Sequence, residues 1–177
     1  EHPNIVSVNR VLEVDGAPAL LMEHVVGLDL VSWMRQHRPD IECRLMLFRQ
    51  IVDAVGYAHS KGILHRDLKP ANILISGGKE APSARVLDFG LAKETTGAPD
   101  EQRTKTGVGM GTPAYMAPEQ ARNAAHVDER ADIFSLGVIL YQLLCDERPF
   151  VGADQLEVMT AAASGQYQPP ALINPAI

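Results

Sequence analysis

Residues 65–72 bring together side chains that suit the transfer of a phosphoryl group onto a hydroxyl. Asp67 can accept the proton of the hydroxyl, and Lys69 can neutralise charge on the phosphate in transit. Asn72, five positions after the aspartate, can bind magnesium through its amide oxygen, and Asp88 can supply a second oxygen ligand. Any one of these residues alone is better explained as a turn cap or a solvated side chain. Together they predict phosphoryl-transfer chemistry.

Two predicted strand pairs would hold part of this set. Residues 5–14 and 19–25 are rich in β-forming side chains and flank the turn-like segment 15–18, which predicts an antiparallel pair. Residues 72–75 and 85–87 predict a second hairpin. Asn72 would then begin one strand of that hairpin, and Asp88 would follow the other.

Helices are predicted over much of the remaining chain. Residues 28–37 favour a short helix, and Asp40 is a plausible N-cap for a long helix that reaches about Ser60. The predicted buried stripe of the long helix comprises Ile41, Leu45, Phe48, Val52 and Val55. Residues 131–144 are apolar on every face, which predicts a central, buried helix, and a further helix is expected over residues 153–164.

Composition narrows the classes of protein. Hydrophobic residues make up 46% of the chain and charged residues 21%, as in globular domains. The net charge of −6, without a Lys/Arg cluster, argues against nucleic-acid binding. Cys43 and Cys145 show no metal or redox spacing, and we expect small buried thiols at both positions.

No targeting or membrane segment is expected in these 177 residues. The most apolar stretch, residues 133–145, is shorter than the roughly 20 residues that a membrane span needs. We therefore expect a cytoplasmic location for this region, and leave open a membrane anchor elsewhere in the full-length protein.

The order of three motifs identifies the chain as a member of a known family. Residues 65–72 (His-Arg-Asp-Leu-Lys-Pro-Ala-Asn) are followed by residues 88–90 (Asp-Phe-Gly) and residues 117–119 (Ala-Pro-Glu). This series resembles the protein kinases. Lys69 and the Gly-Thr-x-x-Tyr sequence that begins at Gly111 resemble the serine/threonine type. The segments around residues 118–122 and 130–137 resemble the eukaryotic-like kinases of bacteria.

The resemblance implies a partial protein-kinase-like fold of the α+β class. Two or more strands of the small lobe would precede a mainly helical large lobe. Residues 1–25 would form the end of the small lobe and the hinge, and residues 26–177 the large lobe without its last helices. The family's Gly-rich loop, its ATP-gripping lysine and the glutamate partner of that lysine do not occur. We therefore expect the chain to be a fragment that is inactive by itself.

The resemblance also implies roles for individual residues. The catalytic residues would be Asp67, Lys69 and Thr112, with Thr112 bonding the other two. The ATP-binding residues would be the gatekeeper Met22, the backbones of Glu23 and Val25 at adenine, Asp29 at the ribose, Lys69 at the phosphate and Leu74 beneath the base. The magnesium ligands would be Asn72 and Asp88.

Regulation and internal support would depend on further residues. Arg66 would pair with a phosphate in the activation loop, and Thr104 and Thr106 would be autophosphorylation sites. The structural residues would be His65, Phe89, Glu119 and Asp132: His65 and Phe89 would stack in an apolar spine with Val8, Asp132 would hold the backbone of the catalytic loop, and Glu119 would lack its arginine partner.

These features imply an enzyme that uses ATP and Mg²⁺ to phosphorylate serine or threonine in proteins, with pairing of two copies as a route to autophosphorylation. A pseudokinase that serves as a scaffold is the alternative, although such proteins usually lose Asp67, Asn72 or Asp88. A small-molecule phosphotransferase is a third reading, which the peptide-groove motif at 117–119 disfavours.

Overall fold

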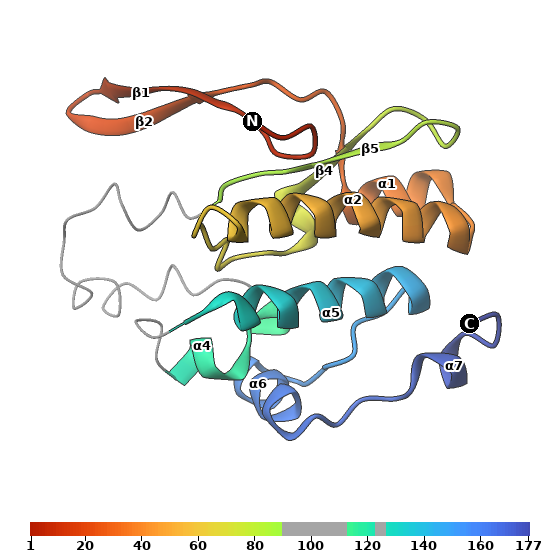
Figure 1. The fold of residues 1–177 in the computed structure, drawn as a ribbon. Helices are drawn as coiled ribbons and strands as arrows, with labels where there is room; N and C mark the ends of the chain where they lie inside the picture. Colours follow the sequence, from red (N-terminus) through yellow and green to blue (C-terminus); the bar gives the residue numbers. More distant parts are fainter. Residues whose placement is uncertain (90–112, 123–126) are drawn as a thin grey trace. The chain divides into compact units, whose positions relative to one another are not determined.

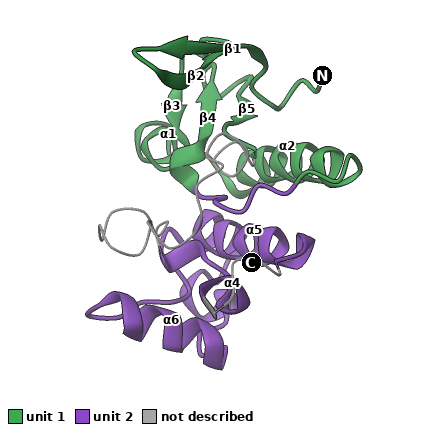
Figure 2. Ribbon diagram, turned by 90° about the vertical axis from the view of Figure 1, so that its left-hand side faces the viewer, with its two compact units in different colours: residues 1–63, 70–97 green, residues 64–69, 98–177 purple. Residues whose placement is uncertain are grey.

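The computed structural model describes residues 1–89, 113–122 and 127–177, and it divides into two compact units (Figures 1 and 2). Unit 1 comprises residues 1–63 and 70–97, and unit 2 comprises residues 64–69 and 98–177. Strands and helices occur together in the described residues, which confirms the α+β class. The lobe boundary after residue 25 stays a prediction.

The first hairpin belongs to unit 1. Strands β1 (Val8–Val14) and β2 (Ala17–Met22) are antiparallel, and Val14 pairs with Ala17. Asp15 and Gly16 have φ angles of 51° and 77°, so these two residues make the whole turn. We predicted a four-residue turn, because the proline at position 18 resembled a turn residue. In the structure that proline lies within a two-stranded sheet, where an edge position tolerates it.

A three-stranded antiparallel sheet forms the centre of unit 1. Its strands lie in the order β3 (Leu28–Asp29), β4 (Ile73–Ser76) and β5 (Ser83–Val86). The predicted second hairpin is thus present as β4 and β5. Strand β3 was not predicted, because two residues are too short to show an alternating pattern. The N-terminal segment also joins the sheet, since the Val6 N–H donates to the Val86 carbonyl at 2.9 Å.

Helix α1 (Leu30–His37) begins after Asp29, whose carboxylate accepts the Ser32 N–H at 3.0 Å. The helix therefore starts two residues later than predicted. Trp33 is buried and donates from its indole Nε1 to the Gly77 carbonyl at 3.0 Å. This bond ties α1 to the end of β4.

Helix α2 (Ile41–His59) has the predicted N-cap, because the Asp40 carboxylate accepts the Cys43 N–H at 3.0 Å. Its buried residues are Leu47, Ile51, Ala54, Val55 and Ala58. Of the predicted stripe, Val55 is buried and Ile41 and Phe48 are half-buried, but the prediction was wrong for Leu45 and Val52, which are 44% and 38% exposed. Helix α2 contacts β5.

Unit 2 is built around α5 (Glu129–Cys145), together with α4 (Pro118–Arg122), α6 (Gln155–Ser164), α7 (Pro170–Ile173) and the 3₁₀ turn Pro113–Tyr115. The Ser135 hydroxyl donates to the Tyr115 carbonyl at 2.7 Å and joins α5 to that turn. We predicted burial on every face of α5. This is wrong for Ile133, which is 57% exposed because no described residue covers it.

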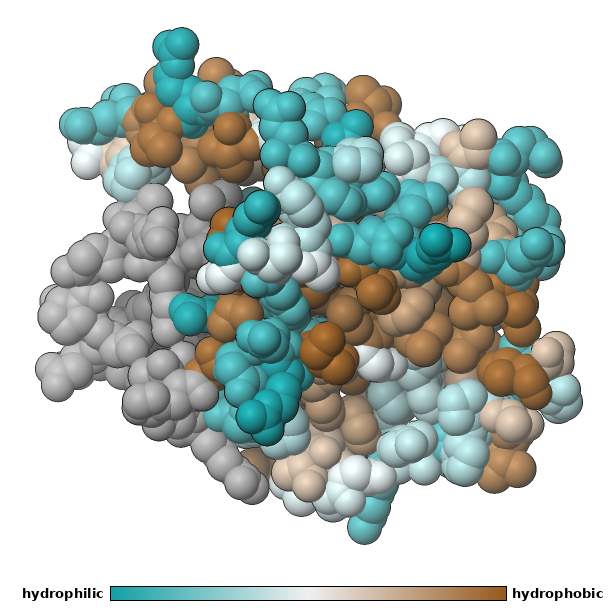
Figure 3. Space-filling model, viewed as in Figure 1, coloured by the Kyte–Doolittle hydropathy of each residue, from teal (hydrophilic) through white to brown (hydrophobic). Residues whose placement is uncertain are grey.

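The described residues contain no helix that is both long and apolar enough to cross a membrane. Apolar side chains do reach the surface on the β1–β2 hairpin, where Figure 3 shows brown atoms among polar ones. Val11 and Val14 are among the exposed residues there.

Candidate active site

The loop of residues 64–69 in unit 2 is held by one buried carboxylate. Asp132, in the first turn of α5, accepts the His65 N–H and the Arg66 N–H, each at 2.8 Å. Arg66 has a φ angle of 65°, in the left-handed region that costs energy for a residue with a side chain. The two bonds to Asp132 offset that cost and fix the path of the chain into Asp67.

Asp67 and Lys69 form an ion pair at the end of this loop. The Lys69 Nζ lies 2.7 Å from Asp67 Oδ2. The Asp67 side chain is 49% exposed, so it can meet a hydroxyl group from outside, while Lys69 is more buried. The Asp67 N–H donates to Nδ1 of the buried His65 at 3.3 Å, which further orients the aspartate.

Gln120 was not predicted as a site residue, but it contacts the same loop. Its side-chain Nε2 donates to the backbone carbonyl of Arg66. The Arg66 peptide units are thus held by Asp132 on one side and by Gln120 on the other. A glutamine one position after the Ala-Pro-Glu motif gave no separate signal in the sequence, because its acceptor lies more than 50 residues earlier.

In unit 1, the antiparallel pairing of β4 and β5 brings Asn72 and Asp88 to the same end of the sheet. The Leu87 N–H donates to the Asn72 carbonyl at 2.9 Å, so Asp88 follows directly after a residue paired with Asn72. Asp88 has a φ angle of 56°. An amide oxygen and a carboxylate suit Mg²⁺, which takes few protein ligands and completes its shell with phosphate and water. No group of three or more His, Cys, Asp or Glu ligands occurs in the described residues.

Residues 23–27 follow β2 in unit 1, and we call them the hinge segment because they overlap the predicted hinge, which ends at Val25. The Glu23 N–H donates to the Ser7 carbonyl at 2.9 Å. A Cβ atom on Gly27 would lie 2.5 Å from the Ile75 carbonyl oxygen. Only glycine therefore allows the hinge segment to run this close to β4.

Asp29 and Leu74 lie opposite each other in the β3–β4 ladder. Burial raises the pKa of the Asp29 carboxyl, but hydrogen bonds from Ser32 and Val31 outweigh burial and hold its pKa below the ordinary value. Asp29 is therefore a charged N-cap at neutral pH.

Two further predicted nucleotide contacts lie near the end of β2. Met22 ends β2 and is half-buried, as is Val25.

The profile of the protein kinase domain family matches residues 1–172. The chain belongs to the protein kinase domain family. Among curated proteins, it is 38% identical to the serine/threonine-protein kinase pkn3 of Myxococcus xanthus, covering 98% of this chain and 32% of that protein. It is 37% identical to the serine/threonine-protein kinase PknE of Mycobacterium tuberculosis, covering all of this chain and 30% of PknE. The kinase chain thus spans about a third of the length of these relatives.

Plants hold relatives of this kinase domain too: CBL-interacting protein kinase 16 of Oryza sativa is 36% identical over 98% of the chain and 37% of that protein. The crystal structure of Rad53 1–466 in complex with AMP-PNP superposes with a TM-score of 0.74 and 32% identity, over 95% of this chain and 40% of that one. These matches confirm the partial protein-kinase fold and the eukaryotic-like serine/threonine group.

Several predicted residues of the kinase domain lie outside the described part of the chain: Thr104, Thr106 and Thr112. Glu119 is exposed, and no ion pair joins it to a described residue. The Nε atom of Arg66 is buried without a hydrogen-bond partner among the described residues. The Nε–H of Arg66 is thus a donor that no described residue uses.

Val8 and Phe89 line one cavity of about 320 Å³ in unit 1. The predicted spine also included His65, which belongs to unit 2, where it is 2% exposed.

The two cysteines are half-buried rather than buried, and desolvation raises the pKa of both thiols. Neither thiol is activated for chemistry.

Proposed function

We propose that this chain is the catalytic region of an ATP- and Mg²⁺-dependent protein kinase that phosphorylates serine and threonine. The observation that carries the proposal is the loop of unit 2, in which a buried carboxylate holds two successive N–H groups and leads into the Asp67–Lys69 ion pair. Fixing a base and a cation on a rigid loop is what phosphoryl transfer requires of a protein.

Asp67 orients the acceptor hydroxyl and takes its proton as the oxygen–phosphorus bond forms. Lys69 is already 2.7 Å from the Asp67 carboxylate, so a small movement of its flexible side chain brings its charge to the phosphate. Thr112 supports both residues. The bond from the γ-phosphorus to the leaving oxygen of ADP breaks in the same step.

Unit 1 binds the nucleotide. The Glu23 carbonyl and the Val25 N–H bind adenine next to the gatekeeper Met22, Leu74 lies beneath the base, and Asp29 reaches the ribose. Asn72 and Asp88 hold Mg²⁺, which supplies positive charge at the phosphates. Mg²⁺ takes few protein ligands, so phosphate oxygens and water would supply its others.

Regulation acts through Arg66, whose buried Nε has hydrogen-bonding capacity left for a phosphate. Thr104 and Thr106 are the proposed phosphate acceptors, modified when two copies of the kinase meet. The residues with a proposed structural role, which hold the active site in shape, are His65, Phe89, Asp132 and Glu119. The kinase region works in the cytoplasm on protein substrates. Mass spectrometry of the full-length protein after incubation with ATP tests the two threonines, and their absence from the modified peptides would refute this part.

The function is tested with the full-length protein, γ-labelled ATP, Mg²⁺ and a protein acceptor that contains serine, threonine and tyrosine. We expect label on phosphoserine and phosphothreonine, and none without Mg²⁺. Label on phosphotyrosine alone, or transfer only to small molecules, would contradict the proposal.

A further inference from the structure

One row of residues crosses the three-stranded sheet of unit 1. Asp29 on β3 lies opposite Leu74 on β4, and Leu74 lies opposite Arg85 on β5. Residues that lie directly opposite each other in a sheet project from the same face. The proposed ribose and adenine contacts therefore share a row with an arginine that has no role in the site described above.

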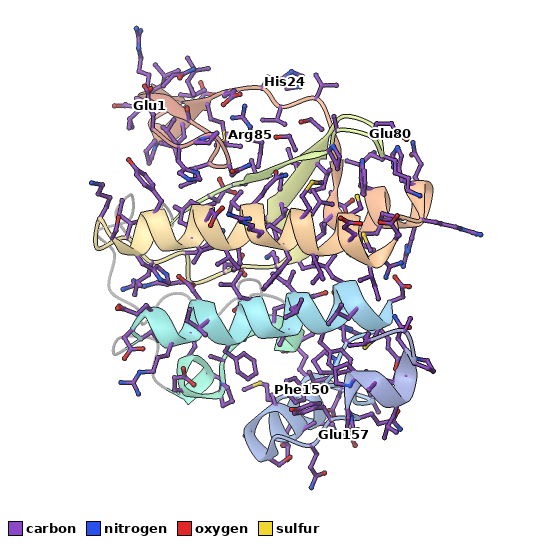
Figure 4. All side chains as sticks on the ribbon, turned by 45° about the vertical axis from the view of Figure 1, so that its right-hand side comes forward. Glu1, His24, Glu80, Arg85, Phe150 and Glu157 are labelled. Atoms are coloured by element: carbon purple, nitrogen blue, oxygen red, sulfur yellow. The ribbon has the colours of Figure 1, made fainter. Side chains whose placement is uncertain are left out.

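Arg85 reaches from this row to the hinge segment. Its Nη1 lies 3.1 Å from Oε2 of Glu23, 62 residues away in the chain. Figure 4 shows the labelled Arg85 side chain between β5 and the segment that joins β2 to β3. The pair is partly buried, with side-chain exposures of 28% for Arg85 and 35% for Glu23.

The other arginine pairs in the described residues differ in kind. Arg49–Asp53 joins neighbours on one helix at 4.0 Å, and Arg130–Asp128 joins residues at one helix start at 3.2 Å. Both arginine side chains are 85% exposed. Such pairs contribute little, because solvent screens them. The Arg85–Glu23 pair is more buried, and it connects strand β5 to the hinge segment.

Glu23 is thereby held at two points. Its N–H bonds the Ser7 carbonyl, and its carboxylate bonds Arg85. Further along the hinge segment, Gly27 lies against the Ile75 carbonyl. The separation between the hinge backbone and Leu74 thus depends on the Arg85 contact at one end and the Gly27 contact at the other.

We infer that Arg85 is a nucleotide-positioning residue, which sets the gap between the Glu23 carbonyl and Leu74 through its ion pair with Glu23. The inference rests on the proposed function, since it assigns adenine to that gap. Arg85 acts through Glu23 and is not a catalytic residue. Its loss should therefore weaken ATP binding while the chemical step of bound ATP continues.

The test measures the Kd of ATP with Mg²⁺ by calorimetry, and kcat and KM for ATP, on the full-length protein. For Arg85→Ala we expect Kd and KM to rise about fivefold to tenfold, with kcat within about twofold of wild type. Glu23→Ala should give a similar rise, and the double variant should be no worse than either single one. The exchanged pair Glu23→Arg with Arg85→Glu should recover part of the affinity. Arg130→Ala, which removes an exposed pair, is the matched control and should leave Kd unchanged.

An unchanged Kd in Arg85→Ala, or effects of the two single variants that add independently, would overturn the inference. If Arg85→Ala fails to fold, Arg85→Lys and the exchanged pair decide the question. The ion pair is supported if both variants bind ATP more tightly than Glu23→Ala does, and it is refuted if either variant binds no more tightly than Glu23→Ala. If wild type binds ATP and Arg85→Ala binds it with the same Kd, only the role of Arg85 is refuted. Wild-type protein that binds no ATP refutes the proposed function as well.

Discussion

The carboxylate of Asp132 accepts the backbone N–H of Arg66 at 2.8 Å, from the first turn of α5. Its other oxygen accepts the N–H of His65. Asp132 is 1% exposed, so the two donors satisfy a buried charge that would otherwise be costly. The loop before the proposed base is therefore attached to the central helix of unit 2.

Replacing Asp132 tests this attachment. Asp132→Ala leaves two N–H groups without their acceptor, and we expect it to lower the free energy of unfolding by about 2–4 kcal/mol. Asp128→Asn is the control. It alters an exposed N-cap of the same helix and should change the free energy of unfolding by only about 0.3 kcal/mol. Denaturant titration of both variants gives the comparison. Equal stability of Asp132→Ala and wild type would contradict the account.

Gln120 should affect the rate more than nucleotide binding. Gln120→Leu removes the donor to the Arg66 carbonyl, and we expect kcat to fall about fivefold with the KM for ATP unchanged. Gln36→Leu, at an exposed position on α1, is the control and should be neutral. A rise in the KM for ATP without a change in kcat would show that Gln120 does not act through the loop.

Two glycines should respond oppositely to alanine. At Gly27 the new Cβ would meet the Ile75 carbonyl, so we expect weaker ATP binding and a stability loss of about 1–3 kcal/mol. At Gly56, inside α2, nothing lies within 4 Å of the new Cβ. Gly56→Ala should instead stabilise the protein by about 0.5–1 kcal/mol. Thermal melts and ATP titrations measure both effects, and a Gly27→Ala protein indistinguishable from wild type would be inconsistent with the close approach.

The N-cap of α1 should depend on pH. The folded-state pKa of Asp29 is lowered, so its stabilising effect is present above its unfolded pKa of about 3.9 and is lost as pH falls through the folded value. Asn can cap the helix without a charge, so the unfolding free energy of Asp29→Asn should vary less below about pH 4. Parallel curves for the two proteins from pH 6 to pH 2 would contradict this prediction.

Local signals predicted much of the structure. Asp40 marks the start of α2, because an N-cap is recognisable from its neighbours, and the motif at residues 65–72 pointed to the protein kinase family. The buried face of α2 was wrong in part, since its sequence offers a second apolar stripe through Leu47, Ile51 and Ala54, and the tertiary packing that buries this stripe is not encoded locally. Arg85 and Gln120 were missed because the partner that each contacts lies more than 50 residues away in the chain.

The central claim is that Asp67 is the base of a protein kinase, and one substitution tests it most directly. Asp67→Asn keeps the size of the side chain but removes its ability to take a proton. With the full-length protein, we predict that ATP with Mg²⁺ binds Asp67→Asn as tightly as wild type. The rate of phosphoryl transfer to a protein serine or threonine should fall by about 10²–10⁴-fold. Transfer by Asp67→Asn at the wild-type rate would contradict the account.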